Sequence, residues 1–270
     1  MTLTSNGYVL DESARRLGEL DPVADHERHD RDALWDRLRR DGYLWLRGAL
    51  DPAVVNGFRG YYHRTLAPSG VWDGAEDRAE YRRLLFHQVV PGPEYEAFCT
   101  QPAVRDWYAW FLGDETFLHR RKLIRHVRPG ESGVGTATQA HYDLVYLRDG
   151  TDRVLSSWIP LGDCPVPRGG LTYLEGSHHR VLAQERAGTL ELPARSLTAD
   201  LPALADEHDA RWLVADYEAG DMVVHSAYTV HASLDNIDDD YRLSTDIRYQ
   251  RATEPIDWRW QQHWHLDDGL

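Results

Sequence analysis

The chain has 270 residues, of which 42% are hydrophobic, and a formal net charge of −14, from 30 basic and 44 acidic residues. This hydrophobic content predicts a folded protein, and the length suits a single domain over residues 1–270. The acidic balance excludes broad binding to nucleic acid or to anionic membranes, because both need a basic surface.

The residues of the first half alternate between helical and extended patterns. Residues 1–28 are polar and predict a loosely docked N-terminal arm. Apolar spacing then predicts a helix over 31–40, a strand over 43–46 and a helix that begins at Asp51-Pro52. A long loop over 68–93 contains a helical piece near 78–85. A further helix is expected over 95–112, with Trp107, Trp110 and Phe111 as buried anchors.

After Gly113, short apolar runs alternate with turn residues, as is typical of a mainly β sandwich or barrel. The predicted strands cover residues 116–127, 135–147, 153–160, 170–174, 212–216, 221–231 and 241–250. Residues 181–210 are rich in Ala, Leu and acidic residues, and predict an insertion with helical content.

The number of cysteines and the hydropathy of the chain indicate in which cellular compartment the protein is expected. Cys99 and Cys164 are too few for a disulfide framework and are not spaced as a CxxC pair. The first residues lack a basic segment followed by an apolar run, and no stretch approaches the roughly 18 apolar residues of a membrane span. We therefore expect a cytoplasmic protein without a membrane segment.

A possible metal site begins at His141-Tyr142-Asp143, inside one of the predicted strands. Residues i and i+2 of a strand point to the same face, so His141 and Asp143 can present an imidazole and a carboxylate side by side. His231 lies on a second predicted strand and can add another imidazole. Two histidines and one carboxylate form the facial triad that holds Fe(II) and leaves positions open for other ligands.

The last predicted strand, over residues 241–250, carries Arg242 and Ser244. Arg242 follows His231 by 11 positions (242 − 231), which is close enough for the two residues to lie on neighbouring strands. A guanidinium matches the geometry of a carboxylate, so Arg242 can fix an acidic cosubstrate.

These motifs together resemble the phytanoyl-CoA dioxygenase-like family of Fe(II)/2-oxoglutarate-dependent oxygenases. The resemblance covers roughly residues 30–260. Its matching stretches are Asp41-Gly42-Tyr43, Gln139-Ala140-His141-Tyr142-Asp143, Trp158-Ile159-Pro160-Leu161, residues 170–178, Gly220-Asp221 with His231, and Arg242-Leu243-Ser244.

The resemblance implies a double-stranded β-helix, a jelly-roll or cupin-like barrel with flanking α-helices. It implies that Fe(II) binds His141, Asp143 and His231. It further implies that Arg242 and Ser244 bind the distal carboxylate of the cosubstrate 2-oxoglutarate, with O2 as the oxidant. The cosubstrate pocket would also be lined by Lys122, which is the only lysine, and by Thr138 and Trp158.

His225 is the rival to His231 as the second histidine ligand. It stands six positions earlier in the same predicted strand, and this even spacing would place both imidazoles on one face. We favour His231, because its interval to Arg242 matches the family and because Ala232 and Ser233 after it are small.

The resemblance also implies the type of reaction. The protein would hydroxylate an unactivated C–H bond of a small molecule and release succinate and CO2. Halogenating relatives replace the carboxylate ligand with a small residue, so Asp143 favours hydroxylation, with desaturation or cyclisation as allied outcomes. Residues that can line the mouth of the site, although each also fits a core or solvent position, are Phe86, His87, Arg121, Arg125 and Tyr146.

Two other functions are compatible with parts of the pattern. A metal-dependent cupin lyase or isomerase would share the fold and the ligands, but it would not need an arginine for a cosubstrate. A catalytically silent β-barrel that binds a ligand is the second alternative, and the complete set of ligands argues against it. Both alternatives predict no response to 2-oxoglutarate.

Overall fold

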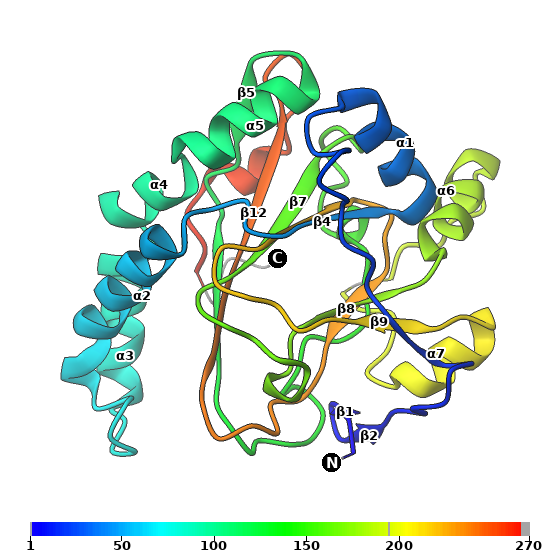
Figure 1. The fold of residues 1–270 in the computed structure, drawn as a ribbon. Coiled ribbons are helices and arrows are strands. Elements are labelled where there is room, and N and C mark those ends of the chain that lie inside the picture. Colours follow the sequence, from blue (N-terminus) through cyan, green and yellow to red (C-terminus); the bar gives the residue numbers. More distant parts are fainter. Residues whose placement is uncertain (1, 194, 266–270) are drawn as a thin grey trace.

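Two facing β-sheets form the centre of the computed structural model, which describes residues 2–193 and 195–265 (Figure 1). The larger sheet has the strand order β4-β10-β7-β12-β5, and β6 also pairs with β12. Its strands are β4 (Tyr43–Leu46), β5 (Thr116–Leu118), β6 (Leu123–Val127), β7 (Leu155–Pro160), β10 (Met222–Ser226) and β12 (Arg242–Arg251).

The smaller sheet has the order β11-β8-β9-β3. Its strands are β3 (Leu17–Glu19), β8 (Leu171–Leu174), β9 (Trp212–Val214) and β11 (His231–Ser233). A separate hairpin joins β1 (Thr4–Ser5) to β2 (Tyr8–Val9). The prediction of a loosely docked arm was wrong for β3, because this strand pairs with β9 in parallel and extends the smaller sheet.

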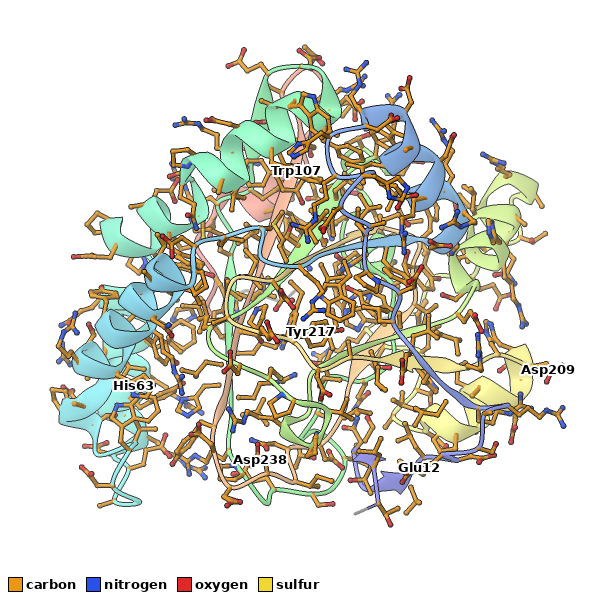
Figure 2. The ribbon with its side chains drawn as sticks, viewed as in Figure 1. Glu12, His63, Trp107, Asp209, Tyr217 and Asp238 are labelled. Atoms are coloured by element: carbon orange, nitrogen blue, oxygen red, sulfur yellow. The ribbon has the colours of Figure 1, made fainter. Side chains whose placement is uncertain are left out.

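Alternating side chains on the larger sheet explain how both of its faces are covered. In β4, Leu44 and Leu46 belong to the hydrophobic cluster under the helices, whereas Tyr43 and Trp45 belong to the cluster shared with the smaller sheet. Both faces of β4 are therefore apolar, as expected for a strand of a sheet that lies between two layers. Tyr217 belongs to the same cluster as Tyr43 and Trp45, and Figure 2 shows it among the side chains that fill the space between the sheets.

Helices flank the two sheets. Figure 1 shows α2 to α5 along one side of the larger sheet and α6 and α7 beside the smaller one. The helices are α1 (Arg31–Asp41), α2 (Pro52–Leu66), α3 (Arg78–Leu84), α4 (Pro93–Cys99), α5 (Pro102–Leu112), α6 (Ser177–Ala187) and α7 (Leu201–His208). The predicted helices at 31–40 and after Asp51-Pro52 are confirmed, and Asp30 and Asp51 cap the first backbone N–H groups of α1 and α2.

The single helix predicted over 95–112 was wrong. The segment forms α4 and α5, because Pro102 cannot donate the backbone hydrogen bond that a continuous helix needs there. Of the three predicted anchors, Phe111 is fully buried and Trp107 stacks on it, but Trp110 is 38% exposed. The helical content expected within 181–210 is present in α6 and α7.

Three of the predicted strands need correction. Residues 116–127 form two strands, β5 and β6. Residues 135–147 contain only bridge pairs at Ala140 and His141, followed by a short 3-10 helix, η3 (Asp143–Val145). Residues 221–231 do not form one strand, because the chain turns after Ser226 and passes from the larger sheet into the smaller one.

The two cysteines and the lengths of the helices bear on the expectations of no disulfide framework and no membrane segment. Cys99 and Cys164 are both buried and form no disulfide. None of the helices within residues 2–193 and 195–265 is both long enough and apolar enough to cross a membrane.

Candidate metal centre

His141 and His231 are paired through their backbones. The His141 N–H donates to the carbonyl of His231 at 3.0 Å, and the His231 N–H donates to the carbonyl of His141 at 2.9 Å. Residues that exchange both hydrogen bonds project their side chains from the same place on the sheet. Their ring centroids are accordingly 4.2 Å apart.

Asp143 joins the two histidines through the local backbone conformation. Tyr142 is extended (φ −125°, ψ 146°), so His141 and Asp143 point to the same side, and η3 begins directly at Asp143. Oδ1 of Asp143 lies 3.8 Å from Nε2 of His141 and 3.9 Å from Nε2 of His231. One ligand atom from each of the three residues lies within 4.8 Å of the others.

Backbone carbonyls fix the orientation of both imidazoles. Nδ1 of His141 is 2.8 Å from the carbonyl of Gln139, and Nδ1 of His231 is 2.9 Å from the carbonyl of Thr229. Each Nδ1 therefore carries the proton, and each Nε2 presents its lone pair to the centre. Burial lowers the pKa of His141 and, together with the neighbouring histidines, holds the pKa of His231 well below its usual range. Both imidazoles are therefore neutral, as metal ligands must be.

The Asp143 carboxylate is held by three neighbours. Burial alone would raise its pKa, but the Arg248 guanidinium and two histidines hold the pKa well below its usual value. Arg248 donates to Oδ1 at 3.1 Å, Ser156 donates to Oδ2, and Nε2 of His225 is 3.6 Å from Oδ2. Asp143 is thus an oriented anion, and its hydrogen-bonded partners resemble those that usually support metal ligands.

Arg242 is buried in the same cavity and has unused donors. The cavity is lined by the three candidate ligands and by Thr138, Trp158 and Arg242. One Arg242 N–H donates to the carbonyl of Gly169 at 2.6 Å, while Nε and the other terminal nitrogen have no hydrogen-bond partner among the described residues. Burial lowers the pKa of Arg242, and a buried guanidinium with open donors fits an anionic ligand.

Ser244 and Lys122 differ in their surroundings. Ser244 lies two positions after Arg242 on β12, and its hydroxyl is buried without a hydrogen-bond partner among the residues that the structure describes. The Lys122 ammonium is 2.5 Å from Oε2 of Glu96 and lies over the ring of Tyr95. Lys122 is therefore directed toward α4, and it does not line the cavity that contains Arg242.

Comparison with models of known protein families shows to which family the chain belongs. A family model described as phytanoyl-CoA dioxygenase (PhyH) matches residues 38–244, a span that includes the three candidate ligands, Arg242 and Ser244. The chain belongs to the phytanoyl-CoA dioxygenase family. Two curated relatives are both named 1-deoxypentalenic acid 11-beta-hydroxylase. The protein from Streptomyces exfoliatus is 24% identical over 83% of this chain and 82% of its own, and that from Streptomyces arenae is 25% identical over the same shares.

Solved structures of non-haem enzymes share the fold. The epimerase SnoN, solved with Fe3+, alpha-ketoglutarate and nogalamycin RO, is 24% identical over 84% of this chain and 85% of its own, with a TM-score of 0.61. The carbocyclase SnoK from nogalamycin biosynthesis is 22% identical over 88% and 89%, also with a TM-score of 0.61. EctD from S. alaskensis, solved with 2-oxoglutarate and 5-hydroxyectoine, is 17% identical over 93% and 88%, with a TM-score of 0.60. The predicted family and the double-stranded β-helix fold with flanking helices are confirmed, although the strands within the described residues form separate sheets and do not close into a continuous barrel.

Sequence reasoning did not identify Arg248 and Ser156 as part of the site. A signal for Arg248 was present, because it follows Arg242 by an even number of positions on one strand and therefore shares its face. Ser156 had a similar signal, because it precedes Trp158, an expected pocket residue, by two positions on the predicted strand and therefore shares its face, whereas Ser157 does not.

Proposed function

We propose that this protein is an Fe(II)- and 2-oxoglutarate-dependent oxygenase that hydroxylates a C–H bond of a small molecule. His141, Asp143 and His231 would hold the iron, and Arg242 with Ser244 would bind the distal carboxylate of 2-oxoglutarate. Bound iron supplies the oxidative chemistry with O2, and the cosubstrate leaves as succinate and CO2. Thr138 and Trp158 would line the cosubstrate pocket.

One observation supports this function above the others. A buried arginine with unused donors lies in the same cavity as two neutral imidazoles and an oriented carboxylate. Two nitrogens and one oxygen are the donor set of a non-haem Fe(II) site with open positions. A cupin lyase or isomerase would use the same ligands, but it would have no use for buried, unpaired guanidinium donors beside them.

The names of the relatives bear on the outcome of the reaction. Both curated relatives are named hydroxylases, which supports hydroxylation, whereas two enzymes of the same fold are named an epimerase and a carbocyclase. We retain ring closure as the second outcome for this reason. Isotopically labelled dioxygen separates the outcomes: one oxygen atom enters succinate in either case, but only hydroxylation places the other in the product formed from the primary substrate.

Anaerobic titration tests the proposal. Addition of Fe(II) and 2-oxoglutarate together should produce a weak visible charge-transfer band that neither produces alone. Arg242→Gln should raise the concentration of 2-oxoglutarate needed for the band, while iron still binds. If wild-type protein binds Fe(II) stoichiometrically but gives no band with 2-oxoglutarate, the cupin alternatives replace this proposal.

A further inference from the structure

The N-terminal hairpin contacts the rest of the protein through a polar turn. Its strands β1 and β2 lie next to the N-terminus, at the lower edge of Figure 1, and Asn6-Gly7 joins them. Both residues have positive φ, at +52° and +81°, as a two-residue type I′ turn requires. Turns of this kind normally face water, but here Ser5 is 0% exposed and Asn6 is 2% exposed. The hairpin is therefore docked by its polar end.

A buried carboxylate holds the turn in place. Asp235 is 1% exposed and lies four positions after the candidate ligand His231. Its two oxygens accept hydrogen bonds from the backbone N–H groups of Asn6 and Gly7, both at 2.9 Å. Oδ1 also accepts one from the Thr136 hydroxyl at 2.9 Å. These three donors are neutral, so compensation of the buried charge depends on the docked turn.

The same hairpin is bonded to both segments that carry the candidate ligands. The side-chain oxygen of Asn6 accepts a hydrogen bond from the Gly135 N–H at 2.8 Å, in the segment that leads to the first histidine. The Ser5 hydroxyl donates to the Ser233 carbonyl at 2.8 Å, in β11, which begins at the second histidine. The docked hairpin therefore fixes the two segments relative to each other.

Backbone pairing continues from the hairpin to the metal centre. The Thr138 N–H donates to the Ser233 hydroxyl at 2.8 Å, and the Ser233 N–H donates to the Thr138 carbonyl at 3.0 Å. Two positions beyond Ser233 along β11, His231 exchanges both backbone hydrogen bonds with His141. Because paired antiparallel segments move together, a displacement at the hairpin end changes the separation of the two imidazoles.

We propose that Asp235 and the Asn6-Gly7 turn form a latch that positions the metal centre, so that docking of the hairpin and binding of the metal strengthen each other. The latch acts through the paired segments and touches neither metal nor substrate, so Asp235 is a positioning residue. By linkage, the factor by which the docked hairpin raises metal affinity equals the factor by which bound metal favours docking. This inference rests on the metal centre of the proposed function but not on its use of 2-oxoglutarate.

Hydrogen exchange in the wild-type protein tests the coupling. Mass spectrometry follows exchange in the peptide over residues 2–12, with and without saturating Mn(II). The N–H groups of Asn6 and Gly7 exchange when the turn leaves Asp235. Bound metal should slow this exchange at least about fivefold, the lower end of usual couplings between sites. Helix α5, which contacts β5 and lies away from the hairpin in Figure 1, is the reference and should slow by less.

A matched pair of variants connects the coupling to the latch. Asp235→Asn replaces one acceptor oxygen with a donor that opposes the N–H groups of the turn. It should speed exchange in the hairpin and raise the Mn(II) dissociation constant at least about fivefold. Asp11→Asn makes the same change of charge at an exposed position of the N-terminal segment, where the carboxylate accepts a hydrogen bond from the Ser13 N–H at 2.8 Å, and it should alter neither quantity. Equilibrium dialysis gives the affinities, and urea unfolding establishes that each variant is folded under the same conditions.

Three results would overturn the latch. These are metal that does not slow exchange in the hairpin, metal that slows α5 as much as the hairpin, or folded Asp235→Asn that binds Mn(II) as tightly as Asp11→Asn. If Asp235→Asn does not fold, exchange in the wild-type protein alone decides. Failure here is distinct from failure of the proposed function. A protein that forms the Fe(II)–2-oxoglutarate band, but whose hairpin does not respond to metal, retains its function and loses the latch.

Discussion

His141 and His231 exchange both of their backbone hydrogen bonds, although they belong to segments that are far apart in the sequence. The two candidate nitrogen ligands are therefore positioned by main-chain pairing and not only by side-chain packing. The pairing exists because the chain leaves β10 at Ser226 and enters β11 at His231, which moves it from one sheet to the other.

The turn places His225 and His231 on different strands, although their ring centroids are only 4.4 Å apart. His231→Ala should weaken Fe(II) binding by more than about 100-fold, because it removes a ligand, whereas His225→Ala should weaken it by less than about tenfold, as expected for a residue that only supports Asp143. Equilibrium dialysis with metal analysis measures both affinities. Equal losses in the two variants would show that His225 is also a ligand.

Adjacent serines on β7 provide a matched pair for the support of Asp143. Ser156 donates to the Asp143 carboxylate, while the Ser157 hydroxyl is 2.6 Å from that of Tyr108 on the opposite face. Ser156→Ala should reduce iron affinity by about 10- to 100-fold, the usual effect of removing a partner of a metal ligand. Ser157→Ala should leave iron affinity unchanged. A loss of iron in Ser157→Ala of the same size would indicate general destabilisation instead.

The planar geometry of Arg242 can be separated from its charge. Arg242→Gln should raise the dissociation constant of 2-oxoglutarate by about 10- to 100-fold, since charge-assisted hydrogen bonds are lost. Arg242→Lys should recover only part of the affinity, because an ammonium lacks the bidentate fork. Lys122→Gln is the control and should bind 2-oxoglutarate normally, because Lys122 pairs with Glu96. Full recovery with lysine would contradict a bidentate contact.

Two glycines test the backbone that supports Arg242. Gly48 and Gly169 both have positive φ, at +58° and +76°, but a Cβ at Gly48 meets nothing within 4 Å, whereas one at Gly169 would lie 2.6 Å from the Leu234 carbonyl oxygen. Gly48→Ala should cost about 1 kcal/mol in the free energy of unfolding, from backbone strain alone. Gly169→Ala should cost more than about 3 kcal/mol, because strain and overpacking combine.

Urea unfolding measures both changes. The Gly169→Ala variant should also bind 2-oxoglutarate less tightly, since the Gly169 carbonyl accepts the hydrogen bond from Arg242. Equal unfolding free energies for the two variants would mean that the backbone at Gly169 relaxes without cost.

His126 predicts a pH-dependent contribution to stability. Burial lowers its pKa to about 4, and the ring stacks on Trp72, which in turn stacks on His63 of α2, labelled in Figure 2. Its pKa in the unfolded chain is about 6.5, so the unfolded state binds more protons between pH 6.5 and 4. Stability from this residue is thus complete above pH 6.5 and decreases as the pH falls toward 4.

His126→Phe keeps the stacked ring and removes the titration. From pH 6.5 to 4, the wild-type protein should lose up to about 3 kcal/mol more unfolding free energy than the variant. Urea unfolding of the metal-free proteins over this range gives the difference, in which the titrating groups that do not interact with His126 cancel; the neighbouring His63 is controlled for by repeating the comparison in a His63→Phe background. Parallel pH profiles would show that His126 is accessible to protons in the folded state.

The alternation of side chains along an extended backbone correctly predicted that His141 and Asp143 lie side by side. The expectation that His141 and Asp143 share a face needs only one extended residue, and Tyr142 provides it. The longer strand predicted around them is absent, because the chain bends into η3 at Asp143. The first two candidate ligands could therefore be paired from sequence without correct knowledge of the surrounding structure.

Long-range pairing explains what the sequence could not predict. Nearly all of residues 222–234 are buried, so their hydropathy gives no sign of the turn that carries the chain between sheets. Tertiary contacts likewise decide that the Lys122 ammonium points toward Glu96 and that Ser156 reaches the Asp143 carboxylate. These features depend on partners more than 10 positions away in the sequence, and no local period encodes them.

Strand β12 fixes the distance between the two arginines of the site, Arg242 and Arg248. Arg242 and Arg248 are six positions apart on the same face, which corresponds to about 20 Å along the strand. At one end Arg242 donates to the Gly169 carbonyl, and at the other Arg248 donates to the Asp143 carboxylate. Insertion of one residue between them would turn Arg248 toward the face that packs on α5 and leave Arg242 in place. Such a variant would keep the Arg242 guanidinium in its cavity but would lose the hydrogen bond from Arg248 that orients Asp143.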